Sequence, residues 1–330
     1  MSTQHITVAV LGTGPVADLV AQRIQKRADL SLAAVLPSSE APPAATDCVI
    51  YLPTSAELAA GTAAERVTGL LRAGFDVVST APPAALHDPH QDKVDSQKAD
   101  LLGACRAGSS TFHGTGGFQS SLITRFNRAF ASITRNIRDI ELIEELDVED
   151  LPAHPWTSPA DLGFDGNGLD NTESQAINAR VAAVEGYYDA GLHTLSEAVF
   201  GNDRADESIE FSAARARHDD NPKRGRSGAQ DAPEQLIVRR TLGSHVAYDS
   251  IWTRRQGSST PLRYRLNTTS TDAIGHVTIT FHAEGDVRPA DHLACSGLLD
   301  AIRPVHESAP GVLRHDLEIN HVKTDDRLTH

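Results

Sequence analysis

Two glycines near the N-terminus, Gly12 and Gly14, have the spacing of a nucleotide-binding turn. They lie in the sequence GTGPVA, after an apolar run at residues 6–11 and before a segment of helical character that reaches about Arg27. In such a strand–turn–helix unit the first glycine permits the tight bend and the second lets a pyrophosphate approach the backbone. The N–H groups and dipole at the helix start then favour an anion. The segment predicts a dinucleotide site, with a purely structural glycine turn as the alternative.

The end of the next predicted strand, residues 32–36, bears on the choice of cofactor. Ser38 and Ser39 follow it, at the place where an NAD site usually has a carboxylate for the ribose 2′-hydroxyl, and Glu40 comes next with no arginine beside it in the sequence. A carboxylate repels a 2′-phosphate, whereas serines tolerate one. We therefore favour NADP over NAD.

The first third of the chain alternates between apolar runs and helical patterns across residues 6–118. This alternation is typical of a doubly wound parallel sheet, and such sheets bind ligands at the carboxyl ends of their strands. The turns there are expected to converge on one crevice. The predicted cofactor contacts are Gly12, Thr13, Gly14, Pro15, Val16, Ser38, Ser39, Leu52, Pro53, Thr80, His113, Gly114 and Thr115.

The pattern changes after Phe118. A helix is expected over 119–133, a half-buried strand over 137–145, a long loop over 150–171 and a helix over 176–200. Closely spaced strands follow at residues 209–213, 236–241, 245–253, 261–269 and 276–283, and they imply a mostly antiparallel sheet. A last helix is expected over 290–302, stopped by Arg303 and Pro304. The predicted fold class is α/β, an N-terminal Rossmann sheet with a central α+β domain.

Five motifs in order, GTGPVA, DCVIYLP, FDVVSTAP, FHGTGGF and DIELIEELDVEDLP, give the chain a family resemblance. It resembles the dihydrodipicolinate reductase superfamily, most closely its branch of 2,4-diaminopentanoate dehydrogenase-like and native amine dehydrogenase-like proteins. The resemblance implies a dinucleotide-binding domain over 1–118, a substrate and oligomerisation domain over 119–289, and a C-terminal segment, 290–330, that packs back on the first domain. It also implies a homodimer or homotetramer.

Two departures from that family bear on the substrate. Leu146 and Asp147 stand where dihydrodipicolinate reductases have a pair of histidines, and Asp150 stands near their lysine. A dicarboxylate would meet carboxylates at residues 144, 145, 147, 149 and 150, which would repel it, whereas a cationic amine or iminium would be attracted. The loop that the branch writes GTGINPGF is shortened here to GTGGF at residues 114–118.

Hydride transfer from a nicotinamide needs alignment and the handling of one proton. The candidates for that proton are Glu145, Asp147, His154 and His193, because buried carboxyl groups and imidazoles can act as general acids. Each has an ordinary alternative: an exposed strand end for the two acids, a solvated loop for His154 and a hydrogen-bonded packing residue for His193.

The overall composition argues against several classes of function. The net charge of −14 argues against nucleic-acid or anionic-membrane binding, and no apolar run approaches the roughly 20 residues of a membrane span. The N-terminus lacks a targeting pattern, so a cytoplasmic location is expected. Three scattered cysteines indicate buried reduced thiols, and no spacing typical of a metal site, a serine hydrolase or a P-loop occurs.

The sequence thus predicts an NAD(P)H-dependent oxidoreductase that acts on the C=N/CH–NH or C=O/CH–OH bond of a small substrate, with an amine-bearing one favoured. Two alternatives stay open. One is a catalytically silent homologue that binds the cofactor or serves as a scaffold. The other is a reductase of an apolar unsaturated substrate, with Trp156, Tyr187, Tyr188 and Trp252 supplying its pocket.

Overall fold

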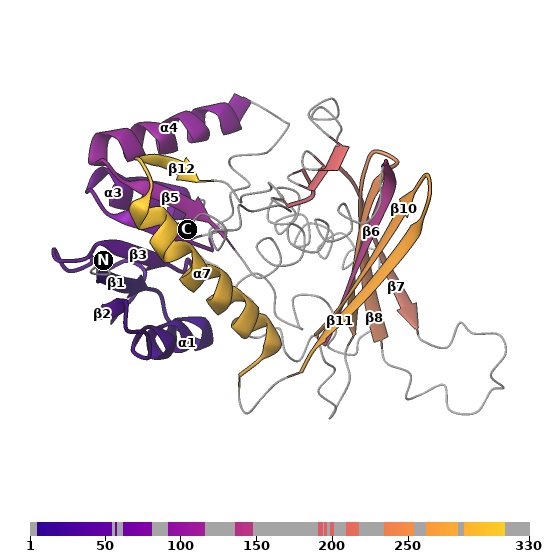
Figure 1. The fold of residues 1–330 in the computed structure, drawn as a ribbon, viewed down its shortest axis with the longest axis horizontal. Coiled ribbons are helices and arrows are strands. Elements are labelled where there is room, and N and C mark those ends of the chain that lie inside the picture. Colours follow the sequence, from indigo (N-terminus) through magenta and orange to yellow (C-terminus); the bar gives the residue numbers. More distant parts are fainter. Residues whose placement is uncertain are drawn as a thin grey trace, which may run out of the picture.

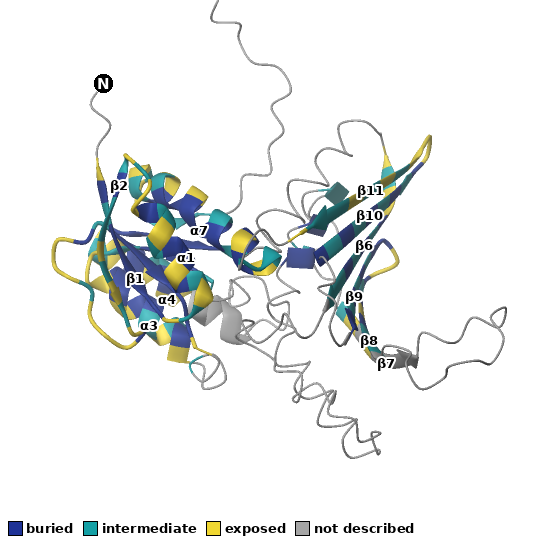
Figure 2. Ribbon diagram, turned by 90° about the horizontal axis from the view of Figure 1, so that it is seen from below, coloured by how far each residue is buried: buried dark blue, intermediate teal, exposed yellow. Residues whose placement is uncertain are grey.

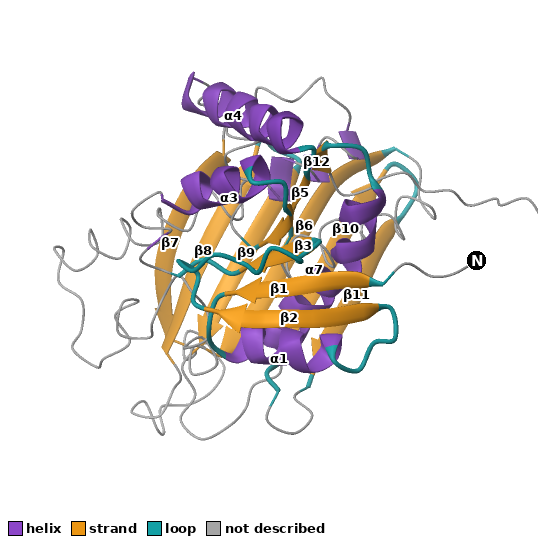
Figure 3. Cartoon of the chain, turned by 90° about the vertical axis from the view of Figure 1, so that its left-hand side faces the viewer, coloured by secondary structure: helices purple, strands orange, loops and turns teal. Residues whose placement is uncertain are grey.

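A computed structural model describes residues 5–54, 57, 62–80, 92–115, 136–147, 191–193, 195–196, 199–200, 209–217, 234–253, 262–282 and 287–313. Within them the chain forms two six-stranded sheets, and helices flank the first sheet (Figure 1). Seen from the side of the first sheet, the strands of the second sheet extend behind it (Figure 3).

The first sheet is parallel throughout, in the order β12-β5-β4-β3-β1-β2. Its strands are β1 (Ile6–Leu11), β2 (Leu30–Leu36), β3 (Cys48–Tyr51), β4 (Asp76–Ser79), β5 (Thr111–Gly114) and β12 (Gly311–Leu313). The helices are α1 (Pro15–Ile24), α3 (Thr62–Arg72), α4 (Asp92–Gly108) and α7 (Pro289–Glu307).

The pleat of the strands divides their apolar side chains between two layers of helices. Ile50 and its neighbours on one face pack with α1 and α7, whereas Val49 and Tyr51 on the other face pack with α3 and α4. The inner strands are therefore buried on both sides, as Figure 2 shows for β1, whereas the edge strand β2 has exposed residues. This is the doubly wound arrangement that the alternating pattern predicts, and the prediction is confirmed.

The C-terminal helix returns to the first sheet and ends later than expected. Pro304 lies inside α7, so the prediction that Arg303 and Pro304 stop the helix was wrong. A proline in the last turn removes one hydrogen bond of the helix. The turn persists because Val305 is buried in the core and His306 Nδ1 lies 3.2 Å from Oδ2 of Asp76. Beyond it, β12 pairs with β5.

The second sheet has the order β11-β10-β6-β9-β8-β7. Its strands are β6 (Ile137–Asp147), β7 (Ile209–Arg217), β8 (Glu234–Leu242), β9 (Val246–Thr253), β10 (Leu262–Ser270) and β11 (Ile274–Phe281). Only the β6–β9 pairing is parallel, which confirms the mostly antiparallel prediction.

Alternate residues give the second sheet a covered face and an open face. Leu142, Tyr248 and Leu266 on the covered face pack with Leu293, which belongs to the helix α7 that packs on the first sheet. The covered face therefore looks toward the first sheet, and the open face looks away from it (Figure 1).

Several expected segments lie outside the described residues, namely the helix 119–133, the loop 150–171 and most of the helix 176–200. The proposed domain boundary at residue 118 also lies outside, so it stays a prediction. Among the helices that the structure describes, none is long and apolar enough to cross a membrane. All three cysteines, Cys48, Cys105 and Cys295, are buried free thiols, as expected.

Candidate functional site

A ladder of hydrogen bonds brings the turns of the first sheet together at its carboxyl edge. The Gly12 N–H donates to the Leu36 carbonyl at 2.8 Å, and the Leu52 N–H donates to the Leu11 carbonyl at 2.8 Å. On the other side, the Thr115 N–H donates to the Ser79 carbonyl at 2.9 Å. The ends of β2, β1, β3, β4 and β5 thus meet along one edge, as the sequence predicts.

Gly12 is required by close packing at this edge. Its φ is +147°, and a Cβ built on it would lie 2.6 Å from the Cβ of Leu52 and 2.8 Å from the Leu52 carbonyl oxygen. No side chain fits there without movement of the β3 end. Gly12 therefore allows β1 to turn directly against β3.

Gly14, unlike Gly12, has open space where a side chain would lie. Its φ is +100°, it precedes the first residue of α1, and a Cβ there would meet nothing within 4 Å. The first bond within the helix runs from the Asp18 N–H to the Gly14 carbonyl at 3.1 Å. The N–H groups of Val16 and Ala17 precede that bond, so they are the donors that a helix start leaves for an anion. The open space and these donors fit a dinucleotide pyrophosphate.

The end of β2 carries a group that the sequence analysis missed. Ser38 is buried and Ser39 is exposed, and Arg66 of α3 reaches this loop. Its Nε donates to the Ser38 carbonyl oxygen at 3.1 Å, and its Nη2 donates to the carbonyl oxygen of Glu40. No arginine is near in sequence, but the crossing of α3 places one here.

A capping box fixes the turn after β3. The Thr54 N–H donates to Oε2 of Glu57 at 2.7 Å, and the Glu57 N–H donates to Oγ1 of Thr54 at 3.2 Å. The Tyr51 hydroxyl donates to Oε1 of Glu57 at 3.2 Å. Burial acts to raise the pKa of Glu57, but the bonds from Thr54, Ser38 and Tyr51 outweigh it and lower the pKa. The carboxylate therefore holds this turn together in its charged form.

The far end of the same edge has two buried polar side chains. His113 is on β5, where its Nδ1 donates to the Leu313 carbonyl oxygen at 3.1 Å, and burial lowers its pKa, so it is neutral near pH 7. Thr115 is 1% exposed, and its Oγ1 has no hydrogen-bond partner among the residues that the structure describes. A buried hydroxyl without a partner is costly, so this oxygen is suited to a ligand.

The covered face of the second sheet holds a buried carboxyl group, Glu144 of β6, which is 5% exposed. Its Oε2 accepts from the Tyr248 hydroxyl at 2.6 Å and its Oε1 accepts from the Tyr264 hydroxyl at 2.7 Å. Burial raises the pKa of Glu144, while the two hydroxyls and the charge of Arg240 act in the opposite direction. Glu144 is a carboxyl group poised to hold a proton on the face that looks toward the first sheet.

The predicted proton donors are not gathered at one place. Glu145 lies on the open face, where Oε1 contacts Nη2 of Arg265 at 2.5 Å and Oε2 contacts Nη1 of Arg263 at 3.3 Å. Asp147 ends β6. His193 is half-buried in a helical turn beside Leu192, and His154 lies outside the described residues. Their catalytic roles stay predictions, and the ion pairs of Glu145 favour a structural role.

The strand alternation also corrects the electrostatic argument about the substrate. Residues 144 and 145 point to opposite faces of the second sheet, and only Glu144 shares a face with Ile140 and Leu142. Glu144 and Glu145 therefore do not belong to one acidic surface. The available signal was the position of Glu144 in phase with the apolar residues of its strand, which marks a buried polar group.

Comparison with known proteins bears on the fold. The sequence matches no family model and no curated protein. The structure is similar to an amine dehydrogenase from Mycobacterium smegmatis, with a TM-score of 0.55, 13% identity and coverage of 96% of this chain and 97% of that one. The chain shares the α/β, Rossmann-like fold of this dehydrogenase.

Two further solved structures share this dehydrogenase fold. One is GenD2 from gentamicin A biosynthesis in complex with NAD, with a TM-score of 0.52, 14% identity and coverage of 94% of this chain and 87% of that one. The other is a probable dehydrogenase from Thermotoga maritima, with a TM-score of 0.54, 12% identity and coverage of 93% and 90%. The likeness does not single out the dihydrodipicolinate reductase branch, which stays a prediction.

Proposed function

We propose that the protein is an NAD(P)H-dependent oxidoreductase of a small substrate, acting on a C=N/CH–NH or C=O/CH–OH bond. The observation that carries the proposal is the turn at Gly12 and Gly14. It combines a glycine that packing requires, open space over the next glycine and the N–H groups of a helix start, all at the carboxyl edge of a parallel sheet. This combination fits a dinucleotide.

The nicotinamide, when bound, supplies or accepts the hydride. The chain has to bind the pyrophosphate, orient the ring and hold one proton. The N–H groups of Val16 and Ala17 would receive the pyrophosphate, and Oγ1 of Thr115 would meet a polar group at the ring end of the edge. NADP(H) is the proposed form, because Ser38 and Ser39 follow β2 where an NAD site has a carboxylate.

Glu144 is the group that we propose to hold the proton. Burial raises its pKa above the ordinary value, which favours the protonated form, and the hydroxyls of Tyr248 and Tyr264 fix both of its oxygens. Glu145 is the matched comparison, since it is one residue away and faces the other side of the sheet. Loss of the carboxyl at 144 is expected to lower turnover by about 10²- to 10⁴-fold, and the same change at 145 by little.

An amine or imine substrate is the favoured class. Support comes from a carboxyl group on the covered face, which can exchange a proton with a nitrogen, and from the similar fold of an amine dehydrogenase. The alternative with an apolar unsaturated substrate stays a prediction: of its four aromatic residues, Trp252 is buried in β9, and the other three lie outside the described residues.

The proposal is tested in two steps with the purified chain. Titration with NADPH and NADH, followed by the fluorescence of the reduced nicotinamide, is expected to show saturable binding. Turnover is then measured on a panel of ketones with ammonia, imines and amines. Absence of binding of either cofactor at high micromolar levels would contradict the proposal. Binding without turnover on any substrate would instead support the catalytically silent alternative.

A further inference from the structure

Arg66 is held at the end of β2 by neutral acceptors only. Its Nε and Nη2 donate to the main-chain oxygens of Ser38 and Glu40, and no carboxylate lies within ion-pair distance of it among the described residues. An arginine guanidinium stays charged at all physiological pH values. The loop after β2 therefore carries a fixed positive charge, and no acidic side chain among the described residues forms an ion pair with it.

The guanidinium also keeps donors for a ligand. It has five N–H bonds, and the two contacts with main-chain carbonyls leave three. A planar guanidinium matches the oxygens of a phosphate better than any other side chain. Because the carbonyls already fix its position, little rotational freedom is lost when an anion binds.

The place of Arg66 in the fold indicates which anion this is. In Rossmann sheets the loop after the second strand reads the 2′ position of the adenosine ribose. The nearby carboxylate, Glu57, accepts bonds from the main chain and hydroxyl of Thr54 and from Tyr51. Its oxygens are thus engaged within the protein, so they are poorly placed to accept a ribose hydroxyl, as an NAD site requires.

We propose that Arg66 is the specificity-determining residue of the cofactor site and that it binds the 2′-phosphate of NADP(H). The inference rests on the proposed function, since it requires a nicotinamide dinucleotide in the crevice. It assigns the cofactor preference to a side chain of α3 that the sequence places 26 residues after Glu40.

The test compares the affinities of the wild-type chain, Arg66→Gln, Arg66→Lys and Arg72→Gln for NADPH and NADH. Arg72 is exposed in the last turn of the same helix and serves as the matched control. We expect the wild type to bind NADPH at least about 10-fold more tightly than NADH. Arg66→Gln should weaken NADPH binding by about 10- to 100-fold and leave NADH binding within about 3-fold, as expected for charge-assisted hydrogen bonds. Arg66→Lys should retain part of the preference, and Arg72→Gln all of it.

Adenosine 2′,5′-bisphosphate and ADP, as competitors of NADPH, report on the 2′-phosphate alone. Adenosine 2′,5′-bisphosphate should displace NADPH from the wild type better than ADP does. The two competitors should be equally effective with Arg66→Gln. Equal binding of NADPH and NADH by the wild type would overturn the inference and leave the proposed function intact. Equal weakening of both dinucleotides in Arg66→Gln, with an unchanged melting temperature, would also overturn it. Absence of binding of either dinucleotide would overturn the proposed function itself.

Discussion

The Tyr264 hydroxyl donates to Oε1 of Glu144 at 2.7 Å, across the β10–β6 pairing at the centre of the second sheet. The two residues are directly paired in register, and both are buried. A carboxyl group held in this way is unusual inside an apolar layer, because removing it from water costs free energy unless it is neutral or fully bonded. Its protonation therefore links the stability of the sheet to pH.

The change Glu144→Gln tests this link. The pKa of Glu144 is raised in the folded chain above the ordinary 4.5, so its stabilising contribution is complete below pH 4.5 and is lost as pH rises through the folded value. The free energy of unfolding of the wild type should therefore fall, relative to Glu144→Gln, as the pH rises above 4.5. Urea unfolding across this range measures the difference. Glu145→Gln, on the open face, is the control, and a pH-independent difference for Glu144→Gln would contradict the prediction.

Gly12→Ala is expected to harm both stability and cofactor binding. The added Cβ would lie 2.6 Å from the Cβ of Leu52, so the end of β3 has to move, at a cost of about 1–3 kcal/mol. Gly69→Ala is the control, since Gly69 lies within α3 with nothing within 4 Å of the added Cβ. It should stabilise the protein by about 0.5–1 kcal/mol. Chemical denaturation and NADPH titration check both variants. If Gly12→Ala and Gly69→Ala changed the free energy of unfolding and the NADPH affinity equally, the contact with Leu52 would be unimportant.

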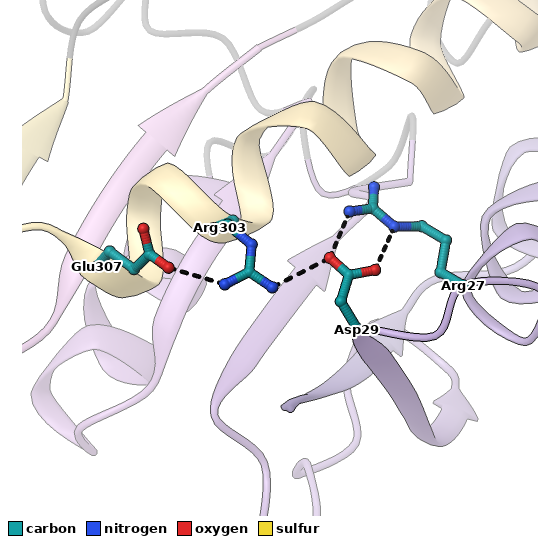
Figure 4. A network of polar contacts seen from close by, with 4 residues as sticks. All are labelled: Arg27, Asp29, Arg303 and Glu307. Atoms are coloured by element: carbon teal, nitrogen blue, oxygen red, sulfur yellow. Dashed lines mark hydrogen bonds and ion pairs between the residues drawn. The ribbon is translucent and has the colours of Figure 1, made fainter. Parts of the chain in front are cut away.

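An ion-pair network fastens the last turn of α7 to the first sheet (Figure 4). Nε and Nη2 of Arg27 donate to Oδ1 and Oδ2 of Asp29 at 2.9 and 2.7 Å. Nη2 of Arg303 also donates to Oδ2 of Asp29, at 3.1 Å. The hydrogen bonds from Arg27 are the main reason that the pKa of Asp29 lies well below 3.8. Asp29→Asn should therefore lower the melting temperature at pH 7.

The contribution of Asp29 is present above pH 3.8 and is lost as pH falls through the folded value, so the difference between the wild type and Asp29→Asn should shrink in strong acid. Glu307→Gln is the control, because Glu307 contacts only the solvent side of Arg303, at 2.8 Å. It should change the melting temperature little. If Glu307→Gln lowered the melting temperature as much as Asp29→Asn does, the prediction would be contradicted.

The open face of the second sheet is the surface on which we expect a homodimer or homotetramer to form. It carries interspersed charges of both signs, with Arg239, Arg263 and Arg265 paired to Glu141, Glu145 and Asp249. Such a pattern is complementary to itself under a two-fold rotation. Light scattering should give a dimer or tetramer mass. Ile251→Arg on this face should reduce that mass, whereas Val35→Arg, at an exposed position on β2 of the first sheet, should not. A monomeric wild type would contradict the prediction.

Much of the fold follows from local sequence. Apolar runs such as residues 6–11 and 48–51 are typical of strands buried on both faces, and the helices between them favour a parallel sheet that is covered on both sides. Gly12 and Gly14 fix the place of the first turn in the same way. The order of the second sheet, with β6 parallel to β9, has no local signal, because pairing between distant strands depends on how whole elements pack.

The sequence by itself determined the glycine turn, the parallel sheet and the edge at which a dinucleotide would lie, because these depend on short-range spacing and backbone geometry. Tertiary structure decided the rest. It placed Arg66 against Ser38 by crossing two elements that are far apart in the chain, and it turned Glu144 inward and Glu145 outward through the pleat of β6. It also let α7 continue beyond Pro304, because burial of Val305 outweighs the tendency of proline to end a helix. The apolar phase of β6 already marks Glu144 in the sequence, but no spacing records where Arg66 and α7 lie, because long-range contacts decide their places.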